Sequence, residues 1–369
     1  MGRALAAVVA ALVAVSSASA GPPAVAAKAY FVENGATGEV LAAEHASARV
    51  PIASITKLMT VLVALERADV DDVVVAAPSP IAIGESTINL RTGERISVGD
   101  LVEAALVQSA NDAAWALAAH VGEGDVNAFV RLMNAKARAL GLRETHFVRP
   151  DGLDVPGHVS SARDVTLLAR AAMRNATIRS IVDDRTATIA GGRRLHTWND
   201  LLGSFPGLIG VKTGHTDAAG WSQVAAARGY GFVLYATLLG SPTRAQRNTD
   251  LTLLLRWGLS RYAPVAVLDE TRTYARAEVG FDLEPVALVV PRSVVRAAQV
   301  ERPLRERIVA ATAVELPVRR GQRLGEVRVY DGSRLVASSP LVAARAVERP
   351  GFTGRASWYA RRTFSNLWP

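Results

Sequence analysis

Residues 51–65 read PIASITKLMTVLVAL, and this stretch decides the fold and the chemistry that the sequence predicts. Its apolar residues recur at helical spacing on one face: Ile55, Leu58, Met59, Leu62 and Leu65. Ser54 and Lys57 stand at the start of this helix, three residues apart, so their side chains lie on the same face. The stretch therefore predicts a helix that presents a serine and a lysine together at its first turn.

A serine–lysine pair in this position is typical of nucleophilic catalysis. A serine hydroxyl is a weak nucleophile until a neighbouring base removes its proton. Lys57 can act as that base only when its amine is neutral, which requires burial or a nearby positive charge such as Lys212. Ser54 at a helix N-terminus also places its own backbone N–H where an oxyanion can form. The alternative is a Ser54 that only caps the helix.

Two further short motifs follow in order along the chain. Residues 109–111 form an S-x-N motif between two helical runs, and residues 212–214 form a K-T-G motif on a predicted strand. We expect Ser109 to relay a proton between a lysine and the leaving amine. We expect the Asn111 amide to hydrogen-bond the substrate. The alternative is that both are turn residues between helices.

The K-T-G strand predicts an edge that binds a carboxylate. Lys212 supplies charge and Thr213 supplies a hydroxyl, while Gly214 lets the substrate approach the backbone. The backbone N–H of His215 is the candidate for the second oxyanion donor, beside that of Ser54. A solvated strand lysine is the alternative for Lys212. Each motif alone is weak, but the three in this order and on these elements predict a serine acyl-enzyme.

The three motifs resemble the active site of penicillin-binding proteins and serine β-lactamases. Their context, KTGHTDAAG at residues 212–220 and HVSSARD at residues 158–164, is similar to the low-molecular-mass D-alanyl-D-alanine carboxypeptidases of peptidase family S11. The resemblance covers about residues 27–263. It implies an α+β catalytic domain of the β-lactamase/transpeptidase type, in which helices pack on an antiparallel sheet.

The resemblance also implies roles for particular residues. Ser54 would be acylated with Lys57 as its base, and Lys212 would bind the carboxylate of the substrate. Arg247 matches a family arginine that helps to hold this terminal carboxylate, although Arg244 is close enough in sequence to compete for the role.

The activity implied is that of a serine-type D-alanyl-D-alanine carboxypeptidase. Such an enzyme removes the terminal D-Ala from peptidoglycan stem pentapeptides, and β-lactam antibiotics inhibit it by acylating the same serine. The alternatives are a D,D-endopeptidase, a class A-like β-lactamase and an inactive scaffold that binds the cell wall. A class A β-lactamase needs a glutamate for deacylation, and Glu144 is the candidate by position. No metal-ligand spacing such as H-E-x-x-H occurs, and we expect neither a metal nor a cofactor.

Composition and patterning predict four parts of the chain. Residues 1–20 have a positive start, an apolar run and Ala-Ser-Ala at the end, which is typical of a signal peptide and predicts export to the periplasm or the outer face of the cytoplasmic membrane. The alternative for this segment is an uncleaved N-terminal anchor. Residues 21–263 form the catalytic domain, and the Val-rich short runs of 264–347 predict a small all-β domain. The tail at 348–369 mixes aromatic residues with arginine and is typical of a helix at a membrane interface. Packing on the β domain is the alternative for the tail.

The chain lacks cysteine and carries a net charge of +8. Disulfides and thiolate metal sites are therefore excluded. The basic charge suits an anionic partner such as phospholipid head groups or an acidic wall polymer. Nucleic acid is not expected as a partner, because no nucleic-acid-binding motif is present.

Periodicity predicts the elements around the motifs. The expected strands of the catalytic domain are 29–32, 39–43, 210–212, 223–227 and 232–238, with a turn at 228–229 between the last two. The other expected helices are 98–107, 112–121, 162–174 and 247–262. The expected strands of the β domain include 286–290, 308–314 and 324–329. Strands at both ends of the catalytic domain, with helices between them, predict one sheet built from both ends.

Overall fold

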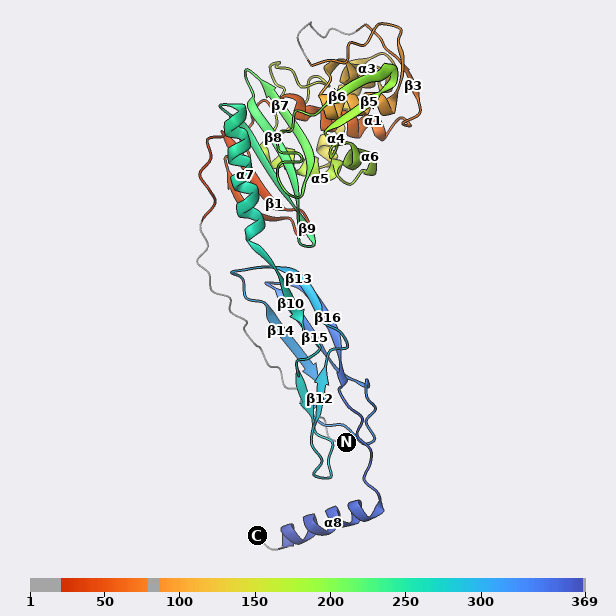
Figure 1. Ribbon diagram of the computed structural model, residues 1–369, viewed down its shortest axis with the longest axis vertical. Helices are drawn as coiled ribbons and strands as arrows, with labels where there is room; N and C mark the ends of the chain where they lie inside the picture. Colours follow the sequence, from red (N-terminus) through yellow and green to blue (C-terminus); the bar gives the residue numbers. More distant parts are fainter. Residues whose placement is uncertain (1–20, 79–85, 368–369) are drawn as a thin grey trace. The chain divides into compact units, whose positions relative to one another are not determined.

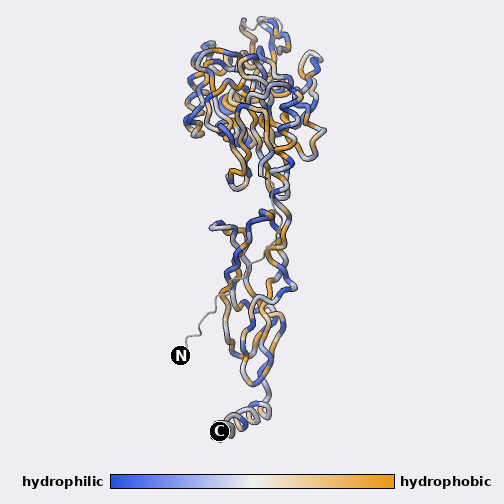
Figure 2. The backbone as a smooth tube through the Cα atoms, turned by 90° about the vertical axis from the view of Figure 1, so that its left-hand side faces the viewer, coloured by the Kyte–Doolittle hydropathy of each residue, from blue (hydrophilic) through white to orange (hydrophobic). Residues whose placement is uncertain are grey.

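The computed structural model describes residues 21–78 and 86–367. The export signal expected at residues 1–20 lies outside this range. The described chain forms two compact units, an N-terminal unit that ends at Ser260 and a C-terminal unit that begins at Arg261. Each unit has a separate hydrophobic core, and hydrophobic segments run through both (Figure 2).

A five-stranded antiparallel sheet organises the N-terminal unit, with the strand order β2-β1-β9-β8-β7. Its strands are β1 Ala29–Asn34, β2 Glu39–Glu44, β7 Leu208–Thr216, β8 Gly220–Gly229 and β9 Phe232–Ser241. Strand β1 pairs with β9, so segments from the two ends of this unit meet inside the sheet. This pairing confirms the sheet expected from both ends. It leaves β7, which carries the K-T-G motif, at one edge (Figure 1).

Helices and two small sheets complete the N-terminal unit (Figure 1). The helical elements are the 3₁₀ turn η1 Ala53–Thr56, α1 Lys57–Leu65, α2 Val98–Glu103, the π-helical η2 Ala104–Gln108, α3 Asn111–Val121, α4 Val126–Ala139, α5 Ala162–Ala172, α6 Ala176–Ile181, the short η3 Ala190–Gly192 and α7 Arg244–Ser260. The small sheets pair β3 Val73–Val75 with β4 Arg95–Ser97, and β5 Thr186–Ile189 with β6 Arg193–His196. Helix α1 is buried from Lys57 to Ala64, because α3, α4 and α5 pack around it. The predicted helix is therefore central, and it is enclosed rather than half exposed.

Several element boundaries differ from those expected. The turn between β8 and β9 lies at Tyr230-Gly231, because Gly231 adopts the positive φ of 71° that the turn needs. Residues 228–229 belong to β8 instead, and β7 is longer than the expected 210–212. Helix α7 ends at Ser260, since Tyr262 begins the first strand of the next unit.

Helix α4 was not expected from the sequence, although its pattern was present. Its buried residues stand at helical spacing: Phe129, Val130, Met133 and Ala137. Asp125 caps its start, with its side chain accepting a hydrogen bond from the Asn127 N–H.

The C-terminal unit is rich in β-structure, as the sequence predicts. Its five-stranded sheet has the order β11-β12-β16-β15-β14, and β10 pairs separately with β13. The strands are β10 Tyr262–Leu268, β11 Ala275–Ala277, β12 Val286–Val289, β13 Val294–Gln299, β14 Arg305–Ala310, β15 Arg323–Asp331 and β16 Arg334–Ala343. Strand β14 ends at Ala310, so residues 311–314 of the expected strand lie beyond it. Helix α8, Phe352–Leu367, follows the sheet.

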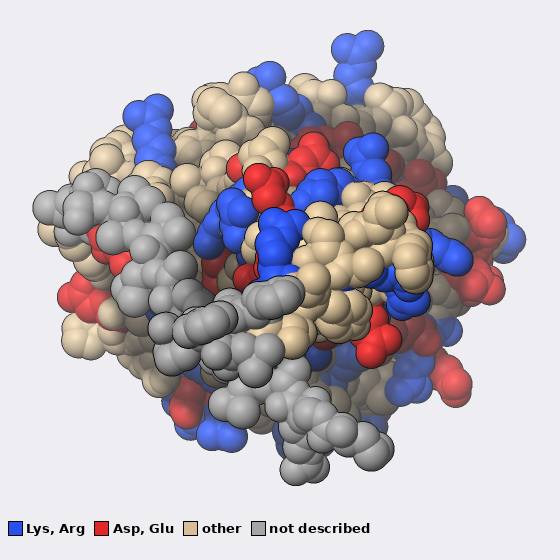
Figure 3. All heavy atoms as spheres, turned by 90° about the horizontal axis from the view of Figure 1, so that it is seen from below, with Lys and Arg blue, Asp and Glu red and all other residues tan. Residues whose placement is uncertain are grey.

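Two properties of the described residues bear on possible partners. None of the helices within residues 21–78 and 86–367 is long and apolar enough to cross a membrane. Lys and Arg side chains are interspersed with Asp and Glu on the face seen in Figure 3. The net charge of +8 is therefore not gathered into a single basic patch on that face.

Candidate active site

Ser54 lies in the η1 turn immediately before helix α1. Ala53 precedes it with a φ of 49°, a left-handed conformation that is uncommon for a residue with a side chain. The Ser54 hydroxyl accepts a hydrogen bond from Lys57 Nζ at 2.6 Å. The N-cap of α1 is Thr56, and no side chain hydrogen-bonds to the helix there. Ser54 is therefore paired with the lysine and has no capping role.

Two glycines from different segments of the chain lie against the backbone of the η1 turn. A Cβ atom on Gly152 would stand 2.1 Å from the Ala53 carbonyl oxygen, and one on Gly214 would stand 2.7 Å from the Ile52 carbonyl oxygen. Both contacts are too short for a side chain. The glycine of the K-T-G motif is thus required by the backbone of the serine turn, whereas the sequence suggested only a role in substrate approach.

Lys57 makes hydrogen bonds to three groups of the site. Its Nζ donates hydrogen bonds to Ser54 Oγ at 2.6 Å, to Asn111 Oδ1 at 2.6 Å and to the carbonyl oxygen of Asp151 at 2.8 Å. The side chain is fully buried. Three acceptors match the three N–H donors of an ammonium group, so the geometry fixes the direction of each N–H bond.

Asp151 is a site residue that the sequence analysis did not identify. Its buried carboxylate accepts hydrogen bonds from Trp115 Nε1 at 2.7 Å and from both Nε (2.5 Å) and Nη2 (2.7 Å) of Arg149. Burial raises the pKa of Asp151, but the Arg149 hydrogen bonds and the charge of Lys57 outweigh it and leave the pKa below its usual value. The carboxylate thus anchors the loop whose carbonyl holds Lys57. The Pro150-Asp151-Gly152 turn signal was the available clue in the sequence.

Ser109 is held by the second lysine. Lys212 Nζ donates to Ser109 Oγ at 2.8 Å and to the Thr213 carbonyl oxygen at 3.1 Å. Ser109 follows the π-helical turn η2 with a φ of 66°, which places the S-x-N motif between helices as expected. The site therefore contains two lysine–serine pairs, Lys57 with Ser54 and Lys212 with Ser109.

The two lysines are electrostatically coupled. Burial lowers the pKa of Lys212 well below its ordinary value, and the positive charges of Lys57 and Arg247 lower it further. The proximity of positive charge that the sequence analysis expected between Lys212 and Lys57 is thus present.

The remaining predicted residues lie on and beside β7. Thr213 is buried, while His215 is exposed and stacks on Trp221 of β8 with ring centroids 3.9 Å apart. Arg247, at the start of α7, is only 1% exposed, and burial lowers its pKa to about 10. Arg244 lies one turn earlier, and its side chain is 37% exposed.

Glu144, the candidate base of a class A β-lactamase, lies on the protein surface. Its carboxylate accepts a hydrogen bond from Arg49 Nε at 2.9 Å, and its side chain is 37% exposed. The acceptors that surround Lys57 come instead from Ser54, Asn111 and Asp151. This arrangement does not support a β-lactamase reading.

Comparison with known proteins gives a consistent picture. A family model described as D-alanyl-D-alanine carboxypeptidase, Peptidase S11, matches residues 16–243. The chain belongs to the peptidase S11 family of D-alanyl-D-alanine carboxypeptidases. It is therefore a serine-type hydrolase of the penicillin-binding class, as the motifs predict.

Individual relatives extend the similarity beyond the family match. The chain is 31% identical over 354 residues to the D-alanyl-D-alanine carboxypeptidase DacD of Salmonella typhimurium, covering 92% of this chain and 90% of the relative. Penicillin binding protein 5 of Haemophilus influenzae has a similar structure, with a TM-score of 0.64 and 27% identity over 89% of this chain and 99% of the other. Penicillin-Binding Protein D2 of Listeria monocytogenes, solved in an ampicillin-bound form, has a TM-score of 0.58 and 32% identity, covering 63% and 98% of the two chains. The likeness to the first two thus spans both units and not the catalytic part alone.

Within the described residues, this family member has no group of three or more His, Cys, Asp or Glu side chains that could hold a metal ion. The side chains described at the site supply three hydroxyls, two amines, an amide and a guanidinium, from Ser54, Ser109, Thr213, Lys57, Lys212, Asn111 and Arg247.

Proposed function

We propose that this carboxypeptidase releases the terminal D-Ala of peptidoglycan stem pentapeptides through an acyl-enzyme on Ser54. The observation that carries the proposal is the 2.6 Å contact between Lys57 Nζ and Ser54 Oγ inside a buried network. Lys57 removes the serine proton, and the Ser54 oxygen attacks the carbonyl carbon of the penultimate D-Ala. The peptide bond breaks, the last D-Ala leaves, and water then hydrolyses the acyl-enzyme.

The hydrogen bonds of Lys57 support its role as the base. A neutral amine keeps two N–H donors and one lone pair. Asn111 Oδ1 and the Asp151 carbonyl oxygen can only accept, so they take both donors. The lone pair then faces Ser54 Oγ, which is the orientation needed to remove its proton. Asn111 in this proposal orients the base as well as binding the substrate amide.

The second lysine pair and β7 serve the leaving group and its carboxylate. Ser109, held by Lys212, relays a proton from a lysine to the departing amine of D-Ala. Lys212, Thr213 and Arg247 bind the terminal carboxylate. The backbone N–H groups of Ser54 and His215 stabilise the oxyanion of the tetrahedral intermediate.

Acylation by β-lactams follows from the same chemistry. A β-lactam presents an amide carbonyl and a carboxylate in the arrangement of the peptide, so Ser54 opens its ring and remains acylated. The ampicillin-bound form of the Listeria monocytogenes relative supports this reading.

The test is intact-protein mass spectrometry after incubation with benzylpenicillin. We expect a stable adduct on the wild type, mapped to the peptide that contains Ser54, and no adduct on Ser54→Ala. The surface variant Ser180→Ala is the matched control and should be labelled like the wild type. Persistent labelling of Ser54→Ala would overturn the assignment of the nucleophile. Penicillin consumed without an adduct would indicate a β-lactamase.

Release of D-Ala from a pentapeptide then tests the substrate. Release from a stem pentapeptide, with a cross-linked dimer left intact, is the result expected of a carboxypeptidase. Cleavage of the dimer without release of D-Ala would identify a D,D-endopeptidase instead.

We also propose that the enzyme acts outside the cytoplasm, with helix α8 at the membrane surface. Helix α8 contains three arginines and no acidic residue. Phe352 and Tyr359 are exposed by 79% and 59%, although apolar rings normally avoid water. Aromatic side chains combined with arginine suit the interface between lipid head groups and acyl chains.

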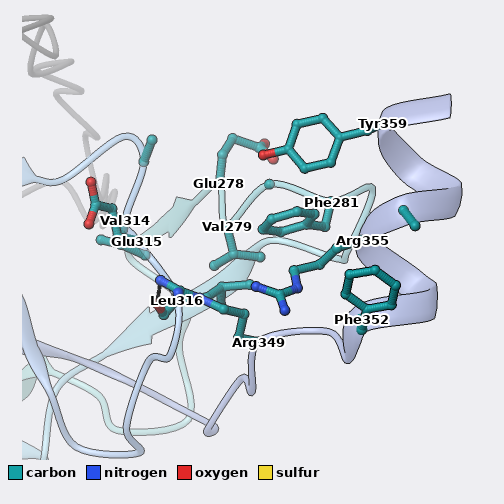
Figure 4. A pocket seen from close by; sticks show the side chains of 13 residues that line it. Glu278, Val279, Phe281, Val314, Glu315, Leu316, Arg349, Phe352, Arg355 and Tyr359 are labelled. Carbon is teal, nitrogen blue, oxygen red and sulfur yellow. Dashed lines mark hydrogen bonds between the residues drawn. The ribbon is translucent and has the colours of Figure 1, made fainter. Parts of the chain in front are cut away.

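Part of α8 packs against its own unit. The Phe281 ring lies 5.0 Å from the Trp358 ring and 6.3 Å from the Tyr359 ring, measured between centroids. A cavity of about 960 Å³ lies beside this contact, and Phe352 and Arg355 of α8 line it together with Phe281 (Figure 4). The packing alternative thus accounts for Trp358, while the exposed Phe352 supports a contact with lipid.

A further inference from the structure

One carboxylate, that of Asp200, organises the start of helix α7. Asp200 lies in the loop between β6 and β7, and its carboxylate accepts hydrogen bonds from both Nε (2.8 Å) and Nη2 of Arg244. It also accepts from Arg247 Nη2 at 3.2 Å and from Asn248 Nδ2 at 2.8 Å. Residues 244, 247 and 248 share one helix face, so a single acid reaches all three.

Arg247 is fixed in direction by these contacts. Asn248 Oδ1 accepts from its Nε at 3.1 Å and from its Nη2 at 2.7 Å, and Asn248 is itself held by Asp200. Because Nε and Nη2 are used in this way, Nη1 is the nitrogen left to recognise a ligand. The guanidinium is 1% exposed and cannot reorient through solvent.

Aromatic rings lie between these arginines and strand β7. The guanidinium carbons of Arg244 and Arg247 lie 6.0 and 5.8 Å from the Trp221 ring centroid, and Trp221 stacks on His215 of β7. Arg244 also lies 5.5 Å from the ring of Trp198. Such cation–π contacts stabilise the charge of a guanidinium beside the ring.

Asp200 also supplies the negative charge that faces Arg247. Arg247 is a buried cation, and its charge reaches the buried Lys212. A buried cation that loses its only anionic partner is strongly destabilised. Among the described residues, Asp200 is the acid paired with Arg247.

We propose that Asp200 is a positioning residue for substrate recognition, holding Arg247 so that its guanidinium meets the terminal carboxylate beside Lys212. The inference rests on the proposed function and names the residue that sets its preference for a free carboxylate. Asp200 does not touch the substrate in this account. It acts through Arg247, with Arg244 and Asn248 completing the frame.

The test compares two probes that differ only in the carboxylate, benzylpenicillin and its methyl ester. The rate constant of acylation is measured for each by mass spectrometry on wild type and Asp200→Asn. We expect Asp200→Asn to slow acylation by the acid about tenfold or more, as for a lost hydrogen bond to a charged group. Acylation by the ester should stay near the wild-type rate, so the acid-to-ester ratio falls. Equal slowing of both probes would show a merely structural role and overturn the proposal.

Two variants make the assignment specific. Arg247→Ala should lower the same ratio, and adding Asp200→Asn to it should lower the ratio no further, because both act through one guanidinium. A further fall in the double variant would overturn the route through Arg247. Asp200→Glu, which keeps the charge, should restore part of the ratio, and a ratio no higher than that of Asp200→Asn would count against the proposal.

A matched control tests the role of Asp200, and the wild type tests the proposed acylation of Ser54. Glu94 accepts two hydrogen bonds from Arg193 at 2.6 and 2.9 Å in the same unit, so Glu94→Gln breaks a similar ion pair elsewhere. Its ratio should equal that of the wild type, and a fall like that of Asp200→Asn would overturn the proposal. A wild type that forms no adduct at all would overturn the proposed function, and this proposal with it.

Discussion

At the residue scale, His158 is a neutral side chain that hydrogen-bonds to Thr56 of the η1 turn. Its Nδ1 accepts a hydrogen bond from the Val148 N–H at 3.1 Å, so Nε2 carries the proton and donates to Thr56 Oγ1 at 2.8 Å. Burial lowers the pKa of His158 to about 4. The hydrogen bonds of His158 are therefore those of a structural residue.

The depressed pKa of His158 predicts a loss of stability in mild acid. The unfolded chain takes up a proton near pH 6.5 and the native histidine only near pH 4, so the free energy of unfolding decreases as the pH falls through this range. Between pH 7 and pH 5 the loss from this residue is about 2 kcal/mol. Urea unfolding at both pH values should show a smaller pH-dependent loss for His158→Gln than for the wild type. His196→Gln, at an exposed position, is the control and should keep the wild-type difference.

The η1 turn shows how elements distant in sequence enclose the backbone around Ser54. Gly152 from the loop after α4 and Gly214 from β7 both press on its backbone. The loop also supplies the Asp151 carbonyl to Lys57, so the same loop contacts both the turn and the lysine. At the scale of elements, the backbone around Ser54 is set by the fit of this loop and β7 around one short turn.

Replacing Gly152 by alanine should displace the turn and impair acylation. Its φ is +87°, and a Cβ atom would also stand 2.7 Å from Thr56 Oγ1. Gly124 is a matched control, because its φ of +91° is similar and no atom lies within 4 Å of its Cβ position. Both variants should lose about 1–2 kcal/mol of unfolding free energy from the left-handed conformation, with a larger loss for Gly152→Ala. Only Gly152→Ala should acylate with benzylpenicillin more slowly; equal rates for the two variants would contradict this account of the turn.

The whole molecule combines two units with separate cores. The residues proposed for catalysis all belong to the N-terminal unit, and the exposed aromatic residues of α8 belong to the C-terminal unit. The proposals for catalysis and for membrane contact therefore concern different units, and each can be tested without changing the other.

Removal of residues 348–369 should abolish vesicle binding and preserve acylation. The full chain should sediment with vesicles that contain anionic phospholipid, and more weakly at high salt, because arginine attraction to lipid is screened. The truncated chain should remain in the supernatant and be labelled by benzylpenicillin at the wild-type rate. Phe352→Ser with Tyr359→Ser should weaken binding without changing net charge. Equal sedimentation of full and truncated chains would contradict the role proposed for the tail.

The sequence by itself predicted the three motifs of the site and the strands of the main sheet, although not Asp151 or helix α4. Ser54 and Lys57 are neighbours on one helix, so their contact follows from local geometry. The alternation of the strands and the position of K-T-G on one of them are local patterns too. Local patterns were less exact at the turn between β8 and β9. This turn lies at Tyr230-Gly231, two residues after the predicted position at 228–229.

The tertiary structure alone decided which groups meet around these motifs. Lys57 contacts a carbonyl 94 residues away at Asp151, and Lys212 contacts Ser109 across 103 residues. Asp200 and Arg244 are 44 residues apart. No periodic pattern encodes such contacts, because they depend on how the loops and strands pack. The motifs therefore indicate the chemistry, and packing determines which carbonyl contacts Lys57 and which carboxylate contacts Arg247.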